Sequence, residues 1–195
     1  MWVSAEAPNA LALFDWSSVI TAFKGNVFSC YRQAFVHLEG TYDVDAKVRA
    51  GQVNGLLGAA VPTLLFLTFG LSMGNVHLTV RIFETEPELT DEWEEVVEAS
   101  FLMPSDKTLG LADWNGTLWE AVPLVPGSYR VRYSAINFGE GEEQFDEEQA
   151  DEEADSPVER YELSFWPAEA APDKIVKTTR PAAAYWHKVA QKTKA

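Results

Sequence analysis

The chain has 195 residues, of which 30 are acidic and 15 are basic, so its formal net charge is −15. It is 47% hydrophobic and 12% aromatic, which is enough apolar material for one packed domain over residues 1–195 and excludes a wholly disordered chain. The acidic balance argues against direct binding to nucleic acid, because the phosphate backbone requires a lysine- and arginine-rich surface.

Strand patterns recur at roughly ten-residue spacing, with turn residues between them. In residues 129–135, for example, Tyr129, Val131 and Tyr133 alternate with polar side chains, as in a strand with one face on the core. Residues 92–103 are rich in glutamate and could form a helix, but their period of two favours a strand. The predicted strands are residues 27–38, 63–70, 76–83, 92–103, 108–114, 118–124, 125–136 and 160–168.

Three turns are predicted between these strands. Asn115 and Gly116 form the strongest hairpin signal in the chain. Gly25 and Asn26 indicate a turn ahead of the first strand, and residues 72–75 indicate a hairpin between the second and third strands.

The C-terminal residues 173–195 are predicted to be a helical extension. Thr179 is the expected N-cap, and Pro181 suits the first turn of a helix. Together these patterns predict an all-β protein: a single-domain β-sandwich of about eight antiparallel strands with a short C-terminal helix.

Most of the net charge lies in one segment. Residues 139–159 contain eleven acidic side chains, and without them the chain has 19 acidic and 15 basic residues. A loop this long between two adjacent strands is either functional or disordered, and we expect an acidic, flexible insert. Charge concentrated in one loop creates a local field that can steer a basic partner.

The sequence indicates a cytoplasmic protein. Cys30 is the only cysteine, so no intramolecular disulfide is expected, and the first residues lack the pattern of a secretory signal. The most apolar window, residues 56–70, is interrupted by Pro62 and is shorter than the ~20 residues that span a bilayer. We therefore expect no membrane insertion.

Catalytic and metal-binding patterns were sought and not found. His37, His77 and His187 lie far apart in the sequence, and none has the spacing of a metal motif. Cys30 lies in an apolar strand, where a lone thiol is usually a core residue and not a nucleophile. We predict no catalytic residue, no metal and no cofactor; the alternative, an enzyme, requires a cleft that tertiary structure forms.

Seven tryptophans raise a second class of function, a carbohydrate- or small-ligand-binding module. Trp114 and Trp119 flank the predicted Asn115-Gly116 turn and are the best candidates to stack on a sugar ring. The competing interpretation is that they fill the core or its rim, as tryptophan commonly does.

Three stretches occur in an order that resembles the competence protein J family. They are "SCYRQAFV" at residues 29–36, "VPLVPGSYRVRYSA" at residues 122–135 and "ERYELSFWPA" at residues 159–168. The chain departs from the family's pattern in an extended N-terminus, an enlarged acidic loop and an extra C-terminal helix.

The resemblance implies a non-enzymatic inhibitor or immunity protein that binds a nuclease or toxin domain. A nuclease groove must be basic to hold phosphates, so an acidic surface could occupy it. The alternative is that the acidic loop only keeps the chain in solution, since rim charges change association rates more readily than affinity. The predicted partner-binding residues are Glu142, Glu143, Phe145, Asp146, Glu147, Glu148, Asp151, Glu152 and Glu153.

Overall fold

The computed structural model describes residues 19–42, 47–143 and 157–193. The elements in these ranges are β1 (Ile20–Cys30), β2 (Gln33–Leu38), β3 (Leu57–Gly58), β4 (Leu64–Thr68), β5 (Met73–Ile82), β6 (Glu95–Met103), β7 (Leu109–Ala112), β8 (Leu118–Ala121), β9 (Gly127–Ile136), α1 (Glu140–Glu143), β10 (Arg160–Pro167), β11 (Lys174–Lys177) and α2 (Pro181–Lys192).

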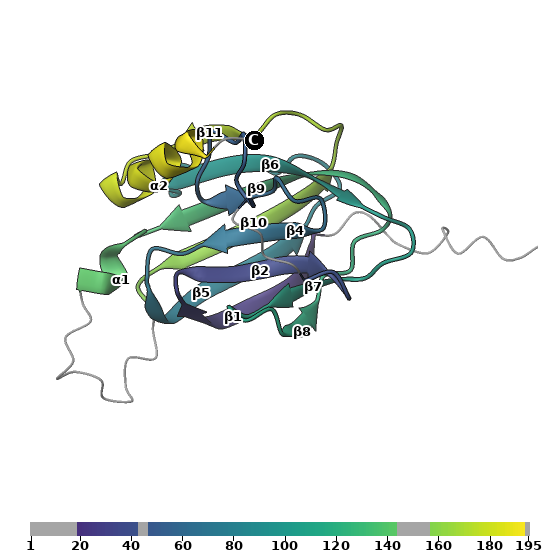
Figure 1. The fold of residues 1–195 in the computed structure, drawn as a ribbon, viewed down its shortest axis with the longest axis horizontal. Coiled ribbons are helices and arrows are strands. Elements are labelled where there is room, and N and C mark those ends of the chain that lie inside the picture. Colours follow the sequence, from purple (N-terminus) through teal and green to yellow (C-terminus); the bar gives the residue numbers. More distant parts are fainter. Residues whose placement is uncertain (1–18, 43–46, 144–156, 194–195) are drawn as a thin grey trace, which may run out of the picture.

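The eleven strands found in the described part of the chain belong to one curled, open sheet. Their order is β11-β6-β9-β10-β5-β1-β2-β4-β3, and β7 pairs with both β2 and β8. The curl is strong enough that β3, at one end of this order, lies close to β6 near the other end. Figure 1 shows the resulting half-barrel, with α2 lying beside β6 and β11.

The core lies on the concave face of this sheet. It is built from the alternate side chains that the sequence pattern places inward, such as Val76, Leu78 and Val80 on β5 and Val131 and Tyr133 on β9, all of them buried. The α-helix α2 adds Ala183 to the same core. The mostly-β class and the C-terminal helix are therefore confirmed, but the helix begins at Pro181, because residues 174–177 of the predicted helical extension pair with β6 as strand β11.

The predicted sandwich of about eight antiparallel strands is wrong in its architecture. One sheet closes on itself far enough to bury its own inner face, so no second sheet is needed. One pair is also parallel: β10 runs alongside β5 with Arg160 opposite His77 and Phe165 opposite Ile82.

Two predicted turns are wrong: one of them lies inside a strand, and the other does not close a hairpin. Gly25 and Asn26 lie inside β1, and the predicted strand at residues 27–38 is divided by a two-residue turn at Tyr31 and Arg32. Residues 72–75 do not close a hairpin, because β4 pairs with β2 and β3 while β5 pairs with β1 and β10.

Other local predictions are confirmed. Asn115 and Gly116 lie between the antiparallel strands β7 and β8, and residues 95–103 form a strand, not a helix. The acidic segment joins β9 to β10, which are adjacent and antiparallel. The N-cap of α2 is Arg180 instead of Thr179. Glu95 Oε1 accepts hydrogen bonds from the backbone N–H groups of both residues, at 2.7 Å from Thr179 and 2.6 Å from Arg180.

Candidate partner-binding surface

The structure describes only the first two of the residues predicted to bind a partner. Glu142 and Glu143 belong to the short helix α1. The other seven predicted residues lie outside the described residues: Phe145, Asp146, Glu147, Glu148, Asp151, Glu152 and Glu153. The assignment of these nine residues to partner binding therefore stays a prediction.

The base of the acidic segment is fixed by one buried carboxylate, that of Glu159. Its Oε1 accepts hydrogen bonds from the backbone N–H groups of Gly139 (3.0 Å) and Gly141 (3.3 Å). Its Oε2 accepts from Leu71 N (3.0 Å) and from the Tyr161 hydroxyl. These bonds join both ends of the acidic segment to the loop after β4. They are charge-assisted and shielded from water, because Glu159 is only 1% exposed.

The Glu159 carboxylate changes the pKa of two buried tyrosine side chains. Burial, together with the nearby Glu159 carboxylate, raises the pKa of both Tyr133 and Tyr161 well above the usual value for tyrosine. Both phenols therefore stay protonated and act as donors, Tyr133 to the backbone oxygen of Thr68 at 3.1 Å.

A second tie joins the base of the acidic segment to α2. The Arg180 guanidinium lies 2.8 Å from Glu94 Oε1 and 2.5 Å from Glu140 Oε1. The bond from Arg180 lowers the pKa of Glu94 despite partial burial, and Glu94 also accepts from the Asn137 backbone N–H at 2.9 Å. Residues 137–140, at the start of the acidic segment, are therefore held in place by contacts with Glu94 and Arg180.

The turn between β1 and β2 carries an unusual sequence. Tyr31 and Arg32 have φ values of 56° and 62°, so both central positions of this two-residue turn are left-handed. Asn-Gly is the usual sequence here, because left-handed backbone costs other residues about 1 kcal/mol or more each. Backbone strain of this kind is often kept where a side chain has a function, and Tyr31 is 72% exposed at the tip of the turn.

Exposed aromatic side chains continue from this turn onto the β7–β8 hairpin. Tyr31 packs edge-on against Trp114, with ring centroids 5.7 Å apart. A hollow of about 260 Å³ lies next to this pair and is lined by Asn26, Val27, Phe28, Asp113, Trp114 and Trp119. We call this hollow the aromatic slot. Phe28, Trp119 and Trp114 are 52%, 41% and 37% exposed, so they are not core residues.

The β1–β2 turn and the base of the acidic segment lie at the same end of the sheet. Arg32 accepts a backbone hydrogen bond from Phe69 and donates one to Ser72 O, at 2.9 and 3.3 Å, which places it beside the loop that Glu159 holds. A hollow of about 380 Å³ at this end is lined by Arg32, Gly70, Phe138, Gly139, Ala182, Tyr185 and Trp186. We call this region the insert end: the β1–β2 turn, residues 70–72, residues 137–143 and the first turns of α2.

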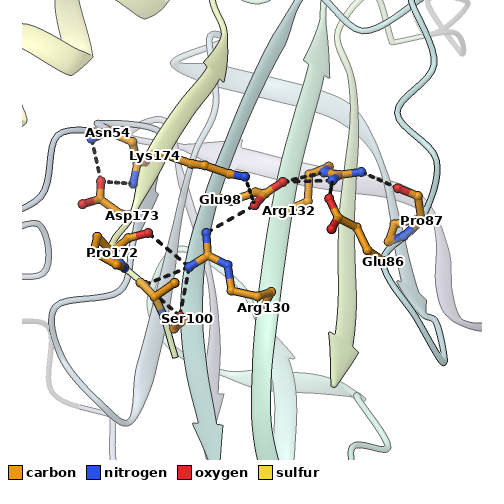
Figure 2. A network of polar contacts seen from close by, with 11 residues as sticks. Asn54, Glu86, Pro87, Glu98, Ser100, Arg130, Arg132, Pro172, Asp173 and Lys174 are labelled. Atoms are coloured by element: carbon orange, nitrogen blue, oxygen red, sulfur yellow. Dashed lines mark hydrogen bonds and ion pairs between the residues drawn. The ribbon is translucent and has the colours of Figure 1, made fainter. Parts of the chain in front are cut away.

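The convex face of the sheet is charged, but its charges satisfy one another. Glu98 is 2% exposed and lies between Arg130, Arg132 and Lys174, at 3.2, 2.9 and 3.0 Å (Figure 2). Arg132 also contacts Glu86 at 2.7 Å. We call these five side chains the outer-face network.

This network holds two loops over the sheet. Arg132 donates to Pro87 O at 2.7 Å, and Arg130 donates to Ala171 O and Pro172 O at 2.9 and 3.2 Å. Burial alone raises the pKa of Glu98, but the hydrogen bonds from Lys174 and Arg132 outweigh it and bring the pKa below its usual value. The carboxylate therefore stays charged, and the network has a structural role.

A groove of about 310 Å³ lies on the same face, between residues 87–93 and strands β5 and β10. Its arginines have carboxylate partners: Arg81 is 3.2 Å from Glu162, and Arg160 is 2.6 Å from Glu92. Burial, with the nearby charges of Lys24 and Arg160, lowers the pKa of His77, so His77 adds no charge at neutral pH. The groove is polar without a strong excess of either charge.

The described residues contain no group of three or more histidine, cysteine, aspartate or glutamate side chains placed to hold a metal ion. Cys30 is buried. His37 contacts two backbone oxygens, Leu38 O at 3.0 Å and Gly116 O at 3.1 Å, and His187 Nδ1 accepts from Gly55 N at 3.0 Å. In the described part of the chain, no helix combines the length and the apolar character that crossing a membrane requires.

Two solved structures are similar to this one, whereas no protein-family model and no curated protein matches the sequence. The crystal structure of ComJ from Bacillus subtilis, an inhibitor of the DNA-degrading activity of NucA, is similar over 78% of this chain and 100% of ComJ, with a TM-score of 0.52 and 11% identity. A structure described as crocagin biosynthetic gene J matches 78% of this chain and 99% of its own, with a TM-score of 0.48 and 13% identity. At this identity the comparison with ComJ establishes a ComJ-like fold.

Sequence reasoning identified Trp114 and Trp119 but missed the residues that the fold places beside them. Phe28 comes from β1, and only the tertiary structure brings it to the hollow beside Trp114 and Trp119, whereas Asp113 directly precedes Trp114 in the turn. Tyr31 was not singled out because Tyr-Arg is not a recognised turn sequence.

Proposed function

We propose that this protein is a non-enzymatic inhibitor that binds a nuclease, or a toxin domain with nuclease activity, and blocks it. The observation that carries the proposal is the ComJ-like fold, which spans the whole of the ComJ chain. The match covers 78% of this chain, so this chain resembles a ComJ-sized inhibitor with additional residues.

The charge distribution supports the same function. A nuclease must present cations to bind phosphates, and the segment that joins β9 to β10 concentrates eleven carboxylates in one stretch of the sequence. Glu159 and Arg180 hold the first residues of that segment, Gly139 and Glu140, in place. Complementary charge of this kind speeds association and selects the partner.

The test begins with a nuclease assay. The chain is used to capture basic proteins from the lysate of its own host and from cells that express neighbouring genes, and each captured protein is assayed for DNA and RNA degradation with increasing amounts of the chain. We expect a stoichiometric excess to abolish the activity of one captured nuclease. If every captured nuclease stays active at that excess, the proposal is wrong.

A charge variant locates the contribution of the acidic segment. In this variant eight carboxylates become amides: Glu142, Glu143, Asp146, Glu147, Glu148, Asp151, Glu152 and Glu153. We expect slower association and weaker inhibition, with the largest difference at low salt because screening removes the contribution of exposed charges. Equal inhibition by the two proteins would keep the inhibitor but assign the acidic segment to solubility alone.

A further inference from the structure

We infer that the aromatic slot binds a cationic side chain of the protein partner, an arginine or a lysine. This inference rests on the proposed function, because it names a contact through which the partner is recognised. Binding of a cation to the slot can also be measured with small probes, without the partner.

The aromatic rings supply the first part of the recognition. Phe28 lies on the exposed face of β1, and Trp114 and Trp119 come from either side of the β7–β8 turn, so rings from two separate hairpins border one hollow. The faces of aromatic rings attract cations, and tryptophan does so most strongly. Three partly exposed rings around a hollow of about 260 Å³ have the composition of a cation-binding aromatic cage.

The charge beside the rings supplies the second part. Asp113 lines the slot, and the described residues form hydrogen bonds only to its Oδ1, from Asn115 N at 3.1 Å and Thr117 N at 2.9 Å. Its Oδ2 therefore remains able to accept from a guanidinium or an ammonium group. Asp113 is the carboxylate among the residues that line the slot.

Lys24 is the cation of β1 that shares a face with Phe28. Four residues separate them, which corresponds to about 13 Å along a strand, so Lys24 does not occupy the slot. An arriving cation meets aromatic rings and a carboxylate instead of a like charge.

The slot is formed before any ligand arrives. Asn115 Oδ1 accepts from Thr117 N (3.0 Å) and from the Thr117 hydroxyl (2.6 Å), and His37 Nε2 lies 3.1 Å from Gly116 O. Gly116 has a φ of 85°, and the ring of Tyr42 packs so closely against it that a Cβ would lie 2.3 Å from the ring. A rigid turn of this kind lowers the entropic cost of binding.

A sugar is the competing ligand for the same rings. Sugar sites combine a stacking ring with several polar groups that bond the hydroxyls, whereas the acceptor side chains that line this slot are those of Asn26 and Asp113. Asn26 Oδ1 already lies 3.4 Å from His77 Nδ1. The balance of three rings to one carboxylate favours a cation.

The first experiment titrates the isolated chain with small probes and follows the tryptophan indole N–H signals by NMR. The probes are N-acetyl-arginine methylamide, the uncharged citrulline derivative of the same shape, and methyl β-glucoside. We expect the arginine derivative alone to shift the signals of Trp114 and Trp119. Equal shifts with the citrulline derivative would overturn the inference, shifts with the glucoside would assign a sugar instead, and no shift with any probe would show that the slot is not a ligand site.

The variants Asp113→Asn and Trp119→Leu test the two parts separately. Asparagine keeps the Oδ1 acceptor that the turn needs and removes the charge, so the turn stays folded while the arginine probe binds about fivefold more weakly. Asp106→Asn is the matched control, because Asp106 is exposed on the loop after β6 and lies outside the slot. Unchanged probe affinity in Asp113→Asn would overturn the role of the carboxylate.

The partner assay separates this inference from the proposed function. We expect Asp113→Asn and Trp119→Leu to weaken nuclease inhibition by about tenfold or more, as interface anchors do, while Leu102→Ala on β6 has no effect. If the natural chain inhibits a nuclease and both slot variants inhibit it equally well, the inference fails and the function stands. If no nuclease is inhibited but the arginine probe binds, the function fails and the slot remains.

Discussion

The outer-face network and the insert end both carry charged and aromatic side chains, but they use them in opposite ways. In the outer-face network, Glu98, Arg130 and Arg132 are buried and each group has a partner from the same chain. At the insert end and in the adjoining aromatic slot, Tyr31, Phe28 and Trp119 are exposed, and the Asp113 carboxylate keeps one oxygen without a hydrogen bond from the described residues. Charge that is matched internally stabilises the fold, whereas rings and carboxylates left at the surface are available to a partner.

Variants in the two regions should therefore differ in whether they change stability or partner binding. A substitution in the outer-face network should change stability and leave partner binding intact in the protein that remains folded. A substitution at the insert end or in the slot should do the reverse, except at the buried base of the acidic segment, where both effects are expected.

The largest effect is expected for Glu98→Ala. Removing this carboxylate leaves the buried guanidinium groups of Arg130 and Arg132 without their shared anion, and breaking a buried pair in this way costs about 3–5 kcal/mol. The free energy of unfolding in urea measures the loss. Glu86→Ala is the control, because Glu86 is largely exposed and contacts the same Arg132, so its loss should cost at most about 1 kcal/mol. Equal losses in the two variants would show that the network is not a buried unit.

A smaller but still large effect is expected for Glu159→Ala. This change leaves the backbone N–H groups of Leu71, Gly139 and Gly141 without their acceptor, and unsatisfied buried donors cost about 1–3 kcal/mol each, partly recovered by water. We expect a loss of about 3 kcal/mol, faster hydrogen exchange at these three amides and slower association with the partner. Glu140→Ala is the control, because Glu140 makes only a partly exposed ion pair with Arg180. Unchanged exchange at these amides would mean that Glu159 does not brace the acidic segment.

Elements with a strong local signal were predicted from the sequence, and elements decided by distant contacts were not. The Asn115-Gly116 hairpin and the alternation in β9 are local properties, and both predictions are confirmed. Gly25 and Asn26 have turn chemistry but lie within β1, because ten residues of β1 pair with β5. Tertiary pairing overrode local preference there, and it also moved the turn to Tyr31 and Arg32.

The surroundings of individual side chains were predicted only in part, for the same reason. The pattern of β9 indicated which residues face the core, but it could not show that Arg130 and Arg132 on the other face are buried as well, since residues 84–93 and 168–174 cover them only in the fold. Trp114 and Trp119 could be named because they flank a recognisable turn. Phe28 reaches the slot through the pairing of distant strands, which no local pattern records.

The contact that docks α2 beside the insert end is expected to weaken in acid. Burial lowers the pKa of His187, an effect that Glu95 and Asp173 oppose, and the neutral ring accepts a hydrogen bond from Gly55 N through Nδ1. Between the lowered folded pKa and the unfolded value of about 6.5, the unfolded chain binds more protons, so stability is complete above about pH 6.5 and falls as the pH drops below it.

The unfolding free energy from pH 7 to pH 5, with hydrogen exchange at Gly55, measures this dependence. We expect His187→Gln to flatten the part of the curve that His187 contributes. His77→Gln is the control for the exchange at Gly55, which it should leave unchanged, because His77 lies on the convex face; its own lowered pKa adds to the pH dependence of the unfolding free energy with the same sign. Unchanged pH dependence of the exchange at Gly55 in His187→Gln would assign the effect to other groups.

The smallest change in stability, and one of opposite sign, is expected for Tyr31→Asn. Asparagine tolerates the left-handed backbone at φ 56°, so it relieves about 1 kcal/mol of strain, while the lost edge-on contact with Trp114 returns part of that gain. We therefore expect the unfolding free energy to stay equal or to rise by up to about 1 kcal/mol, and the partner to dissociate faster because an exposed aromatic anchor is gone. Tyr31→Phe keeps both the ring and the strain, so it should match the natural chain in both measurements. A Tyr31→Asn chain that is more stable and yet binds less well would show that the strained turn is maintained for recognition. If Tyr31→Asn binds its partner as tightly as Tyr31→Phe, the β1–β2 turn lies outside the interface, and only the slot and the acidic segment remain to form it.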